Sequence, residues 1–291
     1  MKRDLKQIGQ IGLGLLGGAI ARRLLREGYS ILGFDLDPER LKEFAQNRGT
    51  VAADLGQVFR ERDVVILSLP HSGTISAMFE AYAGNLQAGQ IVIDTTTGMP
   101  NEMAEIGRYL KARGVDYVEA SVAGSSRQMQ NGEAILFLGG EESVIARIRP
   151  LIDALTDRRF YLGEVGSASR FKLVHNLILG LNRAVLAEGL NFAESLGFDP
   201  KAALEILRQT PAASAVMETK GEKMVHRDWQ PEAKLSQHLK DVGLILAMAE
   251  DAKAQTPLSG LHYDLLEQAE KLGFGDSDNS AILEVFRNGD V

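Results

Sequence analysis

The chain is 291 residues long and carries 32 Lys plus Arg against 39 Asp plus Glu, a formal net charge of -7. This acidic balance gives no support for a nucleic-acid partner, because such proteins need a basic face to displace counterions from phosphate. With 45% hydrophobic and 24% charged residues, the composition is that of a folded globular protein and excludes an intrinsically disordered one. The length suggests two domains.

The sequence contains no cysteine. Disulfides, thiolate nucleophiles and cysteine-ligated zinc or iron–sulfur sites are therefore excluded, and a reducing compartment is favoured. No apolar run reaches the roughly 18 residues that a membrane span needs. We expect a cytoplasmic protein with no membrane partner.

The first half alternates short apolar runs with helical patterns. The runs lack polar alternation, as in strands that are covered on both faces: Gln7–Ile11, Ile31–Phe34, Val64–Leu69, Ile91–Ile93, Val115–Val118 and Ile135–Leu138. The helical patterns lie between them: Gly17–Glu27, Pro38–Asn47, Thr74–Ala81 and Pro100–Arg113. This alternation predicts a parallel, doubly wound α/β sheet.

From Ser167 onward only helical patterns are found. Apolar residues recur at helical spacing from Leu173 until Gly197. Further helices are predicted over Lys201–Arg208, Leu239–Ala252 and Ser259–Lys271, and from about Asp278. This half of the chain is apolar enough to predict a homodimer or a homotetramer.

A glycine-rich turn follows the first strand. It has the pattern G-x-G-x-x-G and consists of Gly12, Leu13, Gly14, Leu15, Leu16 and Gly17. The first glycine permits a tight turn, the second lets backbone amides approach a pyrophosphate, and the third lets the helix pack on the sheet. Because the turn joins a strand to a helix, the pattern predicts dinucleotide binding.

Asp35 lies 18 residues after Gly17, at the end of the second strand. An acid at this place is expected to accept hydrogen bonds from the adenosine ribose. Asp35 and Asp37 would repel a 2′-phosphate, and the nearest cation, Arg40, is expected one turn into the following helix. We therefore expect NAD(H) to be favoured over NADP(H).

The predicted fold class is α/β. An N-terminal Rossmann-type domain, residues 1–163, is followed by an all-α substrate and oligomerisation domain, residues 164–291.

The remaining chemistry has few candidates. The five histidines show no pairing typical of a metal site, and we expect no metal. The sequence has no Tyr-x-x-x-Lys, the pattern of short-chain reductases. A hydride transfer to or from a carbinol still needs a group that moves the hydroxyl proton.

The stretch from Gly163 to Asn176 has the spacing G-x-x-G-x-x-x-x-x-K-x-x-x-N, with Gly166 and Lys172 at the inner positions. It resembles the signature of the β-hydroxyacid dehydrogenases, the relatives of 3-hydroxyisobutyrate dehydrogenase, tartronate semialdehyde reductase and 6-phosphogluconate dehydrogenase. The resemblance extends over nearly the whole chain through Gly12–Gly17, Leu69-Pro70, Asp94–Thr97, Glu119–Gly124, Lys240-Asp241 and Asp278–Ile282.

The resemblance implies a role for each matching residue. Lys172 would be the general acid/base, and Asn176 would orient the substrate. The substrate carboxylate would lie in a loop formed by Ser121, Val122, Ala123, Gly124 and Ser125. The cofactor would be bound by the glycine turn, Asp35, Leu69, Pro70, Thr97 and Lys240.

The residue pattern itself is compatible with this role for Lys172. Lys172 and Asn176 are four residues apart on a predicted helix and therefore share one face. A partly desolvated lysine can have its pKa lowered toward neutrality and can then shuttle a hydroxyl proton. A surface lysine with its ammonium in water is the ordinary alternative for this spacing.

The substrate loop departs from the family pattern A-P-V-S-G-G. Ser121 stands in place of the proline, and Ala123 in place of the serine that commonly binds the substrate carboxylate. Backbone amides at Ala123 and Gly124 could still hold an anion. The departure leaves the substrate open, but not the cofactor.

We therefore expect an NAD(P)-dependent oxidoreductase that interconverts a small 3-hydroxy acid and its semialdehyde or oxo acid. An imine reductase on the same scaffold is a second reading, disfavoured by Lys172 but compatible with the altered loop. A protein that binds NAD(P) without turnover is a third, disfavoured by the intact set of Lys172, Asn176 and Lys240.

Overall fold

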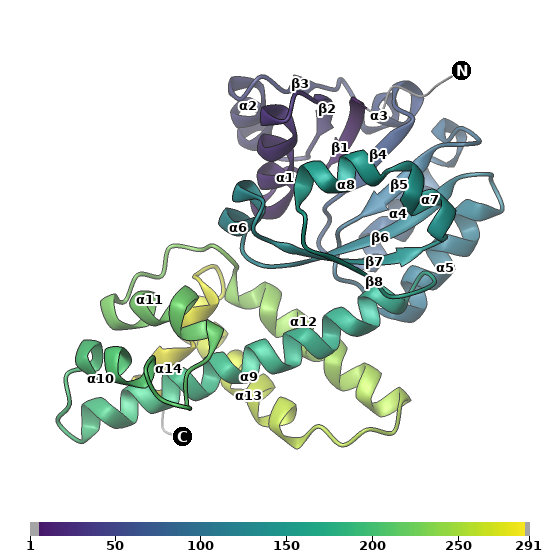
Figure 1. Cartoon of the computed structure of the whole chain (residues 1–291). Coiled ribbons are helices and arrows are strands. Elements are labelled where there is room, and N and C mark those ends of the chain that lie inside the picture. Colours follow the sequence, from purple (N-terminus) through teal and green to yellow (C-terminus); the bar gives the residue numbers. More distant parts are fainter. Residues whose placement is uncertain (1–5, 289–291) are drawn as a thin grey trace. The chain divides into compact units, whose positions relative to one another are not determined.

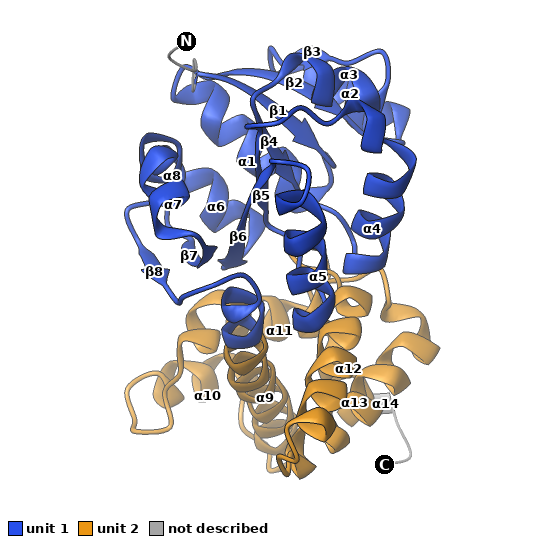
Figure 2. Cartoon of the chain, turned by 90° about the vertical axis from the view of Figure 1, so that its right-hand side faces the viewer, with its two compact units in different colours: residues 1–172 blue, residues 173–291 orange. Residues whose placement is uncertain are grey.

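The computed structural model describes residues 6–288. The chain divides into two compact units, one up to Lys172 and one from Leu173 (Figure 2). This division falls within a helix, nine residues after the predicted boundary at 163, which stays a prediction. The predicted outer limits at residues 1 and 291 lie outside the described residues.

The first unit contains an eight-stranded sheet of order β3-β2-β1-β4-β5-β6-β7-β8 (Figure 1). All neighbouring strands are parallel except β6 and β7, which are antiparallel. The strands are β1 (Gln7–Ile11), β2 (Ser30–Phe34), β3 (Thr50–Val51), β4 (Val64–Leu67), β5 (Ile91–Asp94), β6 (Asp116–Ala123), β7 (Ile135–Gly140) and β8 (Arg159–Tyr161).

Helices cover both faces of this sheet. They are α1 (Leu15–Arg26), α2 (Pro38–Gln46), α3 (Leu55–Glu61), α4 (Ser72–Ala81), α5 (Pro100–Lys111), α6 (Ser126–Asn131), α7 (Glu142–Arg147) and α8 (Arg149–Leu155). Successive strand residues such as Val64 and Val65 belong to two different buried clusters. One cluster contains the buried faces of α1, α7 and α8, and the other those of α3, α4 and α5. The uninterrupted apolar runs are therefore explained by burial on both sides.

The predicted doubly wound fold is confirmed, with corrections to single elements. The predicted strand Val64–Leu69 ends at Leu67, because the Leu69 amide donates to the Thr96 hydroxyl (3.1 Å) instead of to a neighbouring strand. The predicted strand Val115–Val118 continues to Ala123, because its second half pairs with β7. The short elements β3, β8, α3, α6, α7 and α8 were not predicted, since each spans too few residues for a periodic pattern.

The second unit is helical, as predicted. Its helices are α9 (Ser167–Ser195, which begins in the first unit), α10 (Pro200–Leu207), α11 (Glu222–His226), α12 (Leu235–Asp251), α13 (Pro257–Ala269) and α14 (Leu283–Asn288). A single cluster of buried apolar residues includes Leu190 of α9, Leu204 of α10, Val242 of α12 and Leu266 of α13. It also includes residues 281–283 and 285 near the C-terminal end of the described chain. No described helix is both long enough and apolar enough to cross a lipid bilayer.

A buried ion pair fastens the C-terminal part of this unit. Lys220 Nζ lies 2.8 Å from both carboxylate oxygens of Asp278, whose side chain is fully buried. Asp278 also accepts hydrogen bonds from the amides of Glu232 and Ser280. Removing either charge would leave the other buried without its closest counter-charge, at a cost of about 3–5 kcal/mol.

A second buried acid, Asp94, lies at the end of β5. It accepts hydrogen bonds from Tyr117 Oη (2.6 Å) and the Thr96 amide (2.8 Å). Burial raises the pKa of Asp94 to about 6, although these hydrogen bonds lower it. The folded state therefore keeps a proton that the unfolded chain releases near its ordinary pKa of 3.8.

This raised pKa gives a pH-dependent stability. The contribution of Asp94 is fully present below pH 3.8 and is lost as the pH rises to about 6. The loss is on the order of 2–3 kcal/mol in the free energy of unfolding. Urea denaturation from pH 4 to pH 8 should show a smaller fall in stability for Asp94→Asn than for the unsubstituted protein. Asp251→Asn, at an exposed carboxylate, is the control, and equal pH slopes for Asp94→Asn and the unsubstituted protein would contradict the assignment.

Candidate functional site

The predicted nucleotide-binding residues gather at one edge of the sheet. Gly12 follows β1, Asp35 follows β2, Leu69 follows β4 and Thr97 follows β5. These four strands are parallel neighbours, so their carboxyl ends lie together (Figure 1). In doubly wound sheets this edge is where ligands bind.

Two glycines of the turn are required by close backbone approach. Gly12 has a positive φ of 87°, and a Cβ there would lie 2.2 Å from the Ser68 carbonyl oxygen. A Cβ on Gly17 would lie 2.0 Å from the Gly12 carbonyl oxygen. These contacts bring the first turn of α1 against β1 and β4, as the motif predicts.

Gly14, the second glycine of the motif, lies in more open space. A Cβ on Gly14 would meet only the guanidinium of Arg40, at 3.4 Å. Gly14 is the N-cap of α1, and no side chain caps that end of the helix. The first-turn amides are therefore directed at the space beside Gly14, where a pyrophosphate fits both their hydrogen-bonding capacity and the helix dipole.

Asp35 is tied to the glycine turn. Its carboxylate accepts hydrogen bonds from the Leu13 amide (2.6 Å) and the Asp37 amide (2.9 Å). Arg40 lies 3.5 Å from Asp35 and 3.3 Å from Asp37. Arg40 is in the first turn of α2, as expected, but its guanidinium turns back toward both carboxylates, a contact that the sequence did not predict.

The loops after β4 and β5 are linked to each other. The hydroxyls of Ser68 and Thr95 lie 2.7 Å apart, and the Leu69 amide donates to Thr96. Thr97 is half-buried and Pro70 is exposed. These bonds fix the two predicted cofactor loops relative to each other.

The predicted substrate loop is mostly strand. Ser121, Val122 and Ala123 lie in β6 and pair with β7, which corrects the expectation of a loop over Ser121–Ser125. Ser121 is fully buried. Gly124 then turns the chain with a φ of 145°, and Ser125 caps α6 by accepting from the Gln128 amide.

Lys172 reaches this same segment. Its Nζ donates to the Val122 carbonyl oxygen at 2.6 Å, and the side chain is buried, with 8% exposed. The structure thus brings the predicted acid/base together with the predicted carboxylate cradle at the carboxyl end of β6. Lys172 is the last residue of the first unit.

In the second unit, Asn176 and Lys240 form a cluster around Asp241. Asn176 Nδ2 donates to Asp241 Oδ2 (2.9 Å), and Lys240 Nζ lies 3.0 Å from Asp241 Oδ1. Asp241 is buried. The sequence analysis gave it no role beyond the Lys-Asp motif, although a carboxylate next to a candidate lysine was a usable signal.

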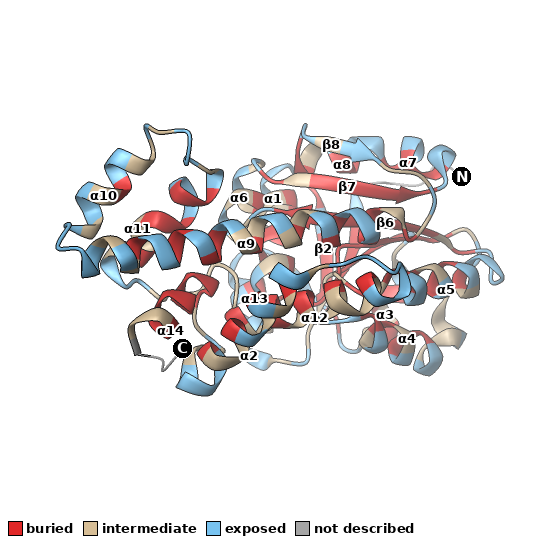
Figure 3. Cartoon of the chain, turned by 90° about the horizontal axis from the view of Figure 1, so that it is seen from below, coloured by how far each residue is buried: buried red, intermediate tan, exposed pale blue. Residues whose placement is uncertain are grey.

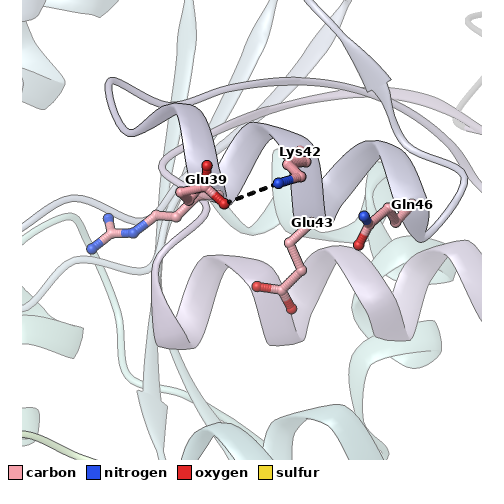
Figure 4. A pocket seen from close by; sticks show the side chains of 5 residues that line it. Glu39, Lys42, Glu43 and Gln46 are labelled. Carbon is pink, nitrogen blue, oxygen red and sulfur yellow. Dashed lines mark hydrogen bonds and ion pairs between the residues drawn. The ribbon is translucent and has the colours of Figure 1, made fainter.

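A shallow surface hollow on α2 is lined by Arg40 and by four further residues of that helix. Its volume is about 340 Å³, and Figure 4 shows that the lining side chains of Glu39, Lys42, Glu43 and Gln46 all come from α2. Residues of one exposed, charged helix face do not make a small-molecule site. Within residues 6–288 no cluster of His, Asp and Glu is arranged to hold a metal ion.

Comparison with protein-family models accounts for both halves of the chain. Residues 7–163 match the NAD binding domain of 6-phosphogluconate dehydrogenase. Residues 166–286 match the model described as NAD-binding of NADP-dependent 3-hydroxyisobutyrate dehydrogenase. The chain belongs to the β-hydroxyacid dehydrogenase family. It is therefore an NAD(P)-dependent oxidoreductase, and the predicted family and enzyme class are confirmed.

Individual relatives cover nearly the whole chain. It is 28% identical over 290 residues to 2-(hydroxymethyl)glutarate dehydrogenase of Eubacterium barkeri, covering 98% of this chain and 96% of the relative. It is 28% identical over 285 residues to L-threonate dehydrogenase of Cupriavidus necator, covering 97% and 96%. The solved 3-hydroxyisobutyrate dehydrogenase of Salmonella typhimurium has a TM-score of 0.88 at 24% identity, covers 96% of this chain and 99% of that chain, and shows the same fold.

The different surroundings of the glycines give a test of the nucleotide site. Gly14→Ala should fold normally, because its Cβ meets only a flexible arginine, but should weaken NADH binding about tenfold or more by filling the pyrophosphate space. Gly17→Ala should instead lower the free energy of unfolding by about 1–3 kcal/mol, because its Cβ meets backbone. Fluorescence titration and thermal melts measure the two effects.

Gly84→Ala, in the same unit, is the matched control, since nothing lies within 4 Å of its added Cβ. It should change neither NADH affinity nor the packing of α1. Unchanged NADH affinity in Gly14→Ala would place the pyrophosphate elsewhere.

Proposed function

We propose that this protein interconverts a small 3-hydroxy acid and its semialdehyde or oxo acid, with Lys172 as the general acid/base. The single observation that carries the proposal is the contact between Lys172 Nζ and the Val122 carbonyl. It holds the ammonium at the carboxyl edge of the sheet, on the strand next to β5 and its cofactor loop. The nicotinamide of the bound cofactor supplies or accepts the hydride.

Residues of the chain would carry out proton transfer, substrate binding and cofactor binding. Lys172 in its neutral amine form would take the hydroxyl proton when the hydroxy acid is oxidised and become the ammonium, which would return the proton when the carbonyl is reduced. The Gly124 amide, just beyond the paired part of β6, would hold the substrate carboxylate, since Ala123 is paired with Ile135 of β7. Asn176 orients the substrate, and Lys240 contributes to cofactor binding. Asp241 would fix both of these side chains, since it already contacts each of them.

The substrate class is supported by the relatives and limited by the altered cradle. The two relatives described above are named for hydroxy acids, 2-(hydroxymethyl)glutarate and L-threonate. Ala123 supplies no hydroxyl where the family commonly has one, and the Ser121 hydroxyl is buried in β6. A substrate panel should therefore include hydroxy acids of different length and, for the imine reductase alternative, cyclic imines.

Substitution of Lys172 tests the proposed mechanism. Lys172→Ala should lower kcat by about 10²–10⁴-fold, the range typical of a lost general acid/base. Its NADH dissociation constant should stay nearly unchanged, because the glycine turn is intact. Lys201→Ala, at an exposed lysine of α10, is the control and should keep full activity. Retained turnover in Lys172→Ala would mean that another group carries the proton.

For the cofactor we propose NAD(H). Asp35 and Asp37 place two carboxylates where the adenosine ribose is expected, and both would repel a 2′-phosphate. The position of Arg40 favours the second candidate, NADP(H), because its guanidinium lies between these carboxylates and Gly14.

Fluorescence titration with NADH and NADPH separates the two cofactors. We expect tighter NADH binding, and an affinity for NADH that Arg40→Ala changes little. Lys42→Ala, on the same helix, controls for lost surface charge. Tighter NADPH binding that Arg40→Ala abolishes would instead establish NADP(H) as the cofactor.

We also propose that the protein self-associates through α9. Ile178, Val185 and Phe192 are seven residues apart and 55%, 67% and 62% exposed. Figure 3 shows exposed residues recurring along this helix. A period of seven places these side chains in one stripe, as in helices that pack lengthwise against another helix. The occupant we propose is a second copy of the chain, in a homodimer or a homotetramer.

A further inference from the structure

Glu119 is a fully buried residue of β6. Its carboxylate reaches the start of α9. Its Oε2 accepts from the Gly166 amide at 2.6 Å, and its Oε1 accepts from the Ser169 hydroxyl. Burial raises the pKa of Glu119, while hydrogen bonds from Ser169 and from the Gly166 and Ala168 amides lower it. The carboxylate therefore caps the first turn of a 29-residue helix from outside the helix.

The sheet keeps room for this carboxylate. Gly139 of β7 lies directly opposite Glu119 in the strand register. A Cβ on Gly139 would lie 2.6 Å from Glu119 Oε2 and 3.1 Å from the Glu164 carbonyl oxygen. Any larger residue at position 139 would push against the carboxylate, so the strand pair is built around it.

The same strand and the same helix are joined a second time at Lys172. Glu119 and Val122 are three residues apart on β6, and their partners Ser169 and Lys172 are three residues apart on α9. The two contacts are separated by roughly 10 Å along the strand and roughly 4.5 Å along the helix. The long Lys172 side chain spans the extra distance to the Val122 carbonyl oxygen. The first contact fixes the helix start, and the second fixes the ammonium.

We propose that Glu119 is a positioning residue for Lys172. It fixes the first turn of α9, so that the ammonium lies at Val122 instead of sampling other positions. This inference rests on the proposed role of Lys172. The neighbouring buried acid, Asp94, does not hold α9 in this way, because its hydrogen bonds go to Tyr117 and Thr96.

Two variants test the proposal. Glu119→Ala removes the cap and should lower kcat about 10²-fold, since a displacement of about 1 Å is enough for such a loss. NADH affinity should change less than twofold, because the glycine turn is not involved. Glu119→Gln keeps one oxygen that can accept from Gly166, and should recover much of the lost kcat. A role in stability alone would lower the melting temperature without changing kcat.

Asp54→Ala is the matched control. Asp54 caps α3 in the same unit by accepting from the Gln57 amide at 2.7 Å. It should lower the melting temperature and leave kcat unchanged. If Glu119→Ala does not fold, Ser169→Ala removes one of the same hydrogen bonds and should lower kcat about tenfold, a fractional loss expected for part of the support.

The outcomes separate this inference from the proposed function. If Lys172→Ala is inactive while Glu119→Ala and Ser169→Ala keep full kcat, Glu119 is a structural cap only and the inference is wrong. If kcat and NADH affinity fall together in Glu119→Ala, the effect is general and the inference is also wrong. If Lys172→Ala itself keeps its activity, the proposed function fails first.

Discussion

The hydrogen bond from Lys172 Nζ to the Val122 carbonyl is the contact on which the rest of the site depends. A buried ammonium is costly unless it has an acceptor, and β6 provides one at 2.6 Å. Because β6 is parallel to β5, its carboxyl end lies at the same edge of the sheet as the glycine turn. One contact thus places the Lys172 side chain at the same edge of the sheet as the loops after β1, β4 and β5. Gly12 lies close to the Ser68 carbonyl oxygen, and Gly17 lies close to the Gly12 carbonyl oxygen. These approaches hold the glycine turn against the chain that follows β4.

The core of the first unit contains two fully buried carboxylates, Asp94 and Glu119. Asp94 and Glu119 lie opposite each other on β5 and β6, and both have raised pKa values because they are buried. Each is satisfied by several donors, including a tyrosine hydroxyl for Asp94 and a serine hydroxyl for Glu119. Burial of these carboxylates lowers the stability of the fold at neutral pH. Their hydrogen bonds fix the loop after β5 and the start of α9. Asp94 is the last residue of β5, and Glu119 lies beside it in the middle of β6.

Much of this arrangement could be predicted from the sequence. The uninterrupted apolar strands indicated the doubly wound sheet, and the spacing from Gly12 to Asp35 indicated the nucleotide site. Lys172 and Asn176 were selected by their spacing together with the family resemblance. The strand–loop boundary at Ser121 was wrong, because pairing with β7 is a non-local property. Asp241 and Glu119 were not assigned roles, because their importance depends on partners 65 and about 50 residues away in the chain. Arg40 was placed in the correct helix turn, but the direction of its side chain depends on Asp35.

The ion pair between Lys220 and Asp278 has a consequence for synthesis of the protein on the ribosome. Until residue 278 has left the exit tunnel, Lys220 has only the more distant carboxylate of Glu232 (3.9 Å) as a counter-ion, and the amide of Glu232 has no carboxylate to bind. The helical unit can therefore complete this contact only after residue 278 has been synthesised, when all strands of the first unit's sheet have already been made. Nascent chains that stall before this point would also lack the last members of this unit's buried cluster, Ala281, Ile282, Leu283 and Val285.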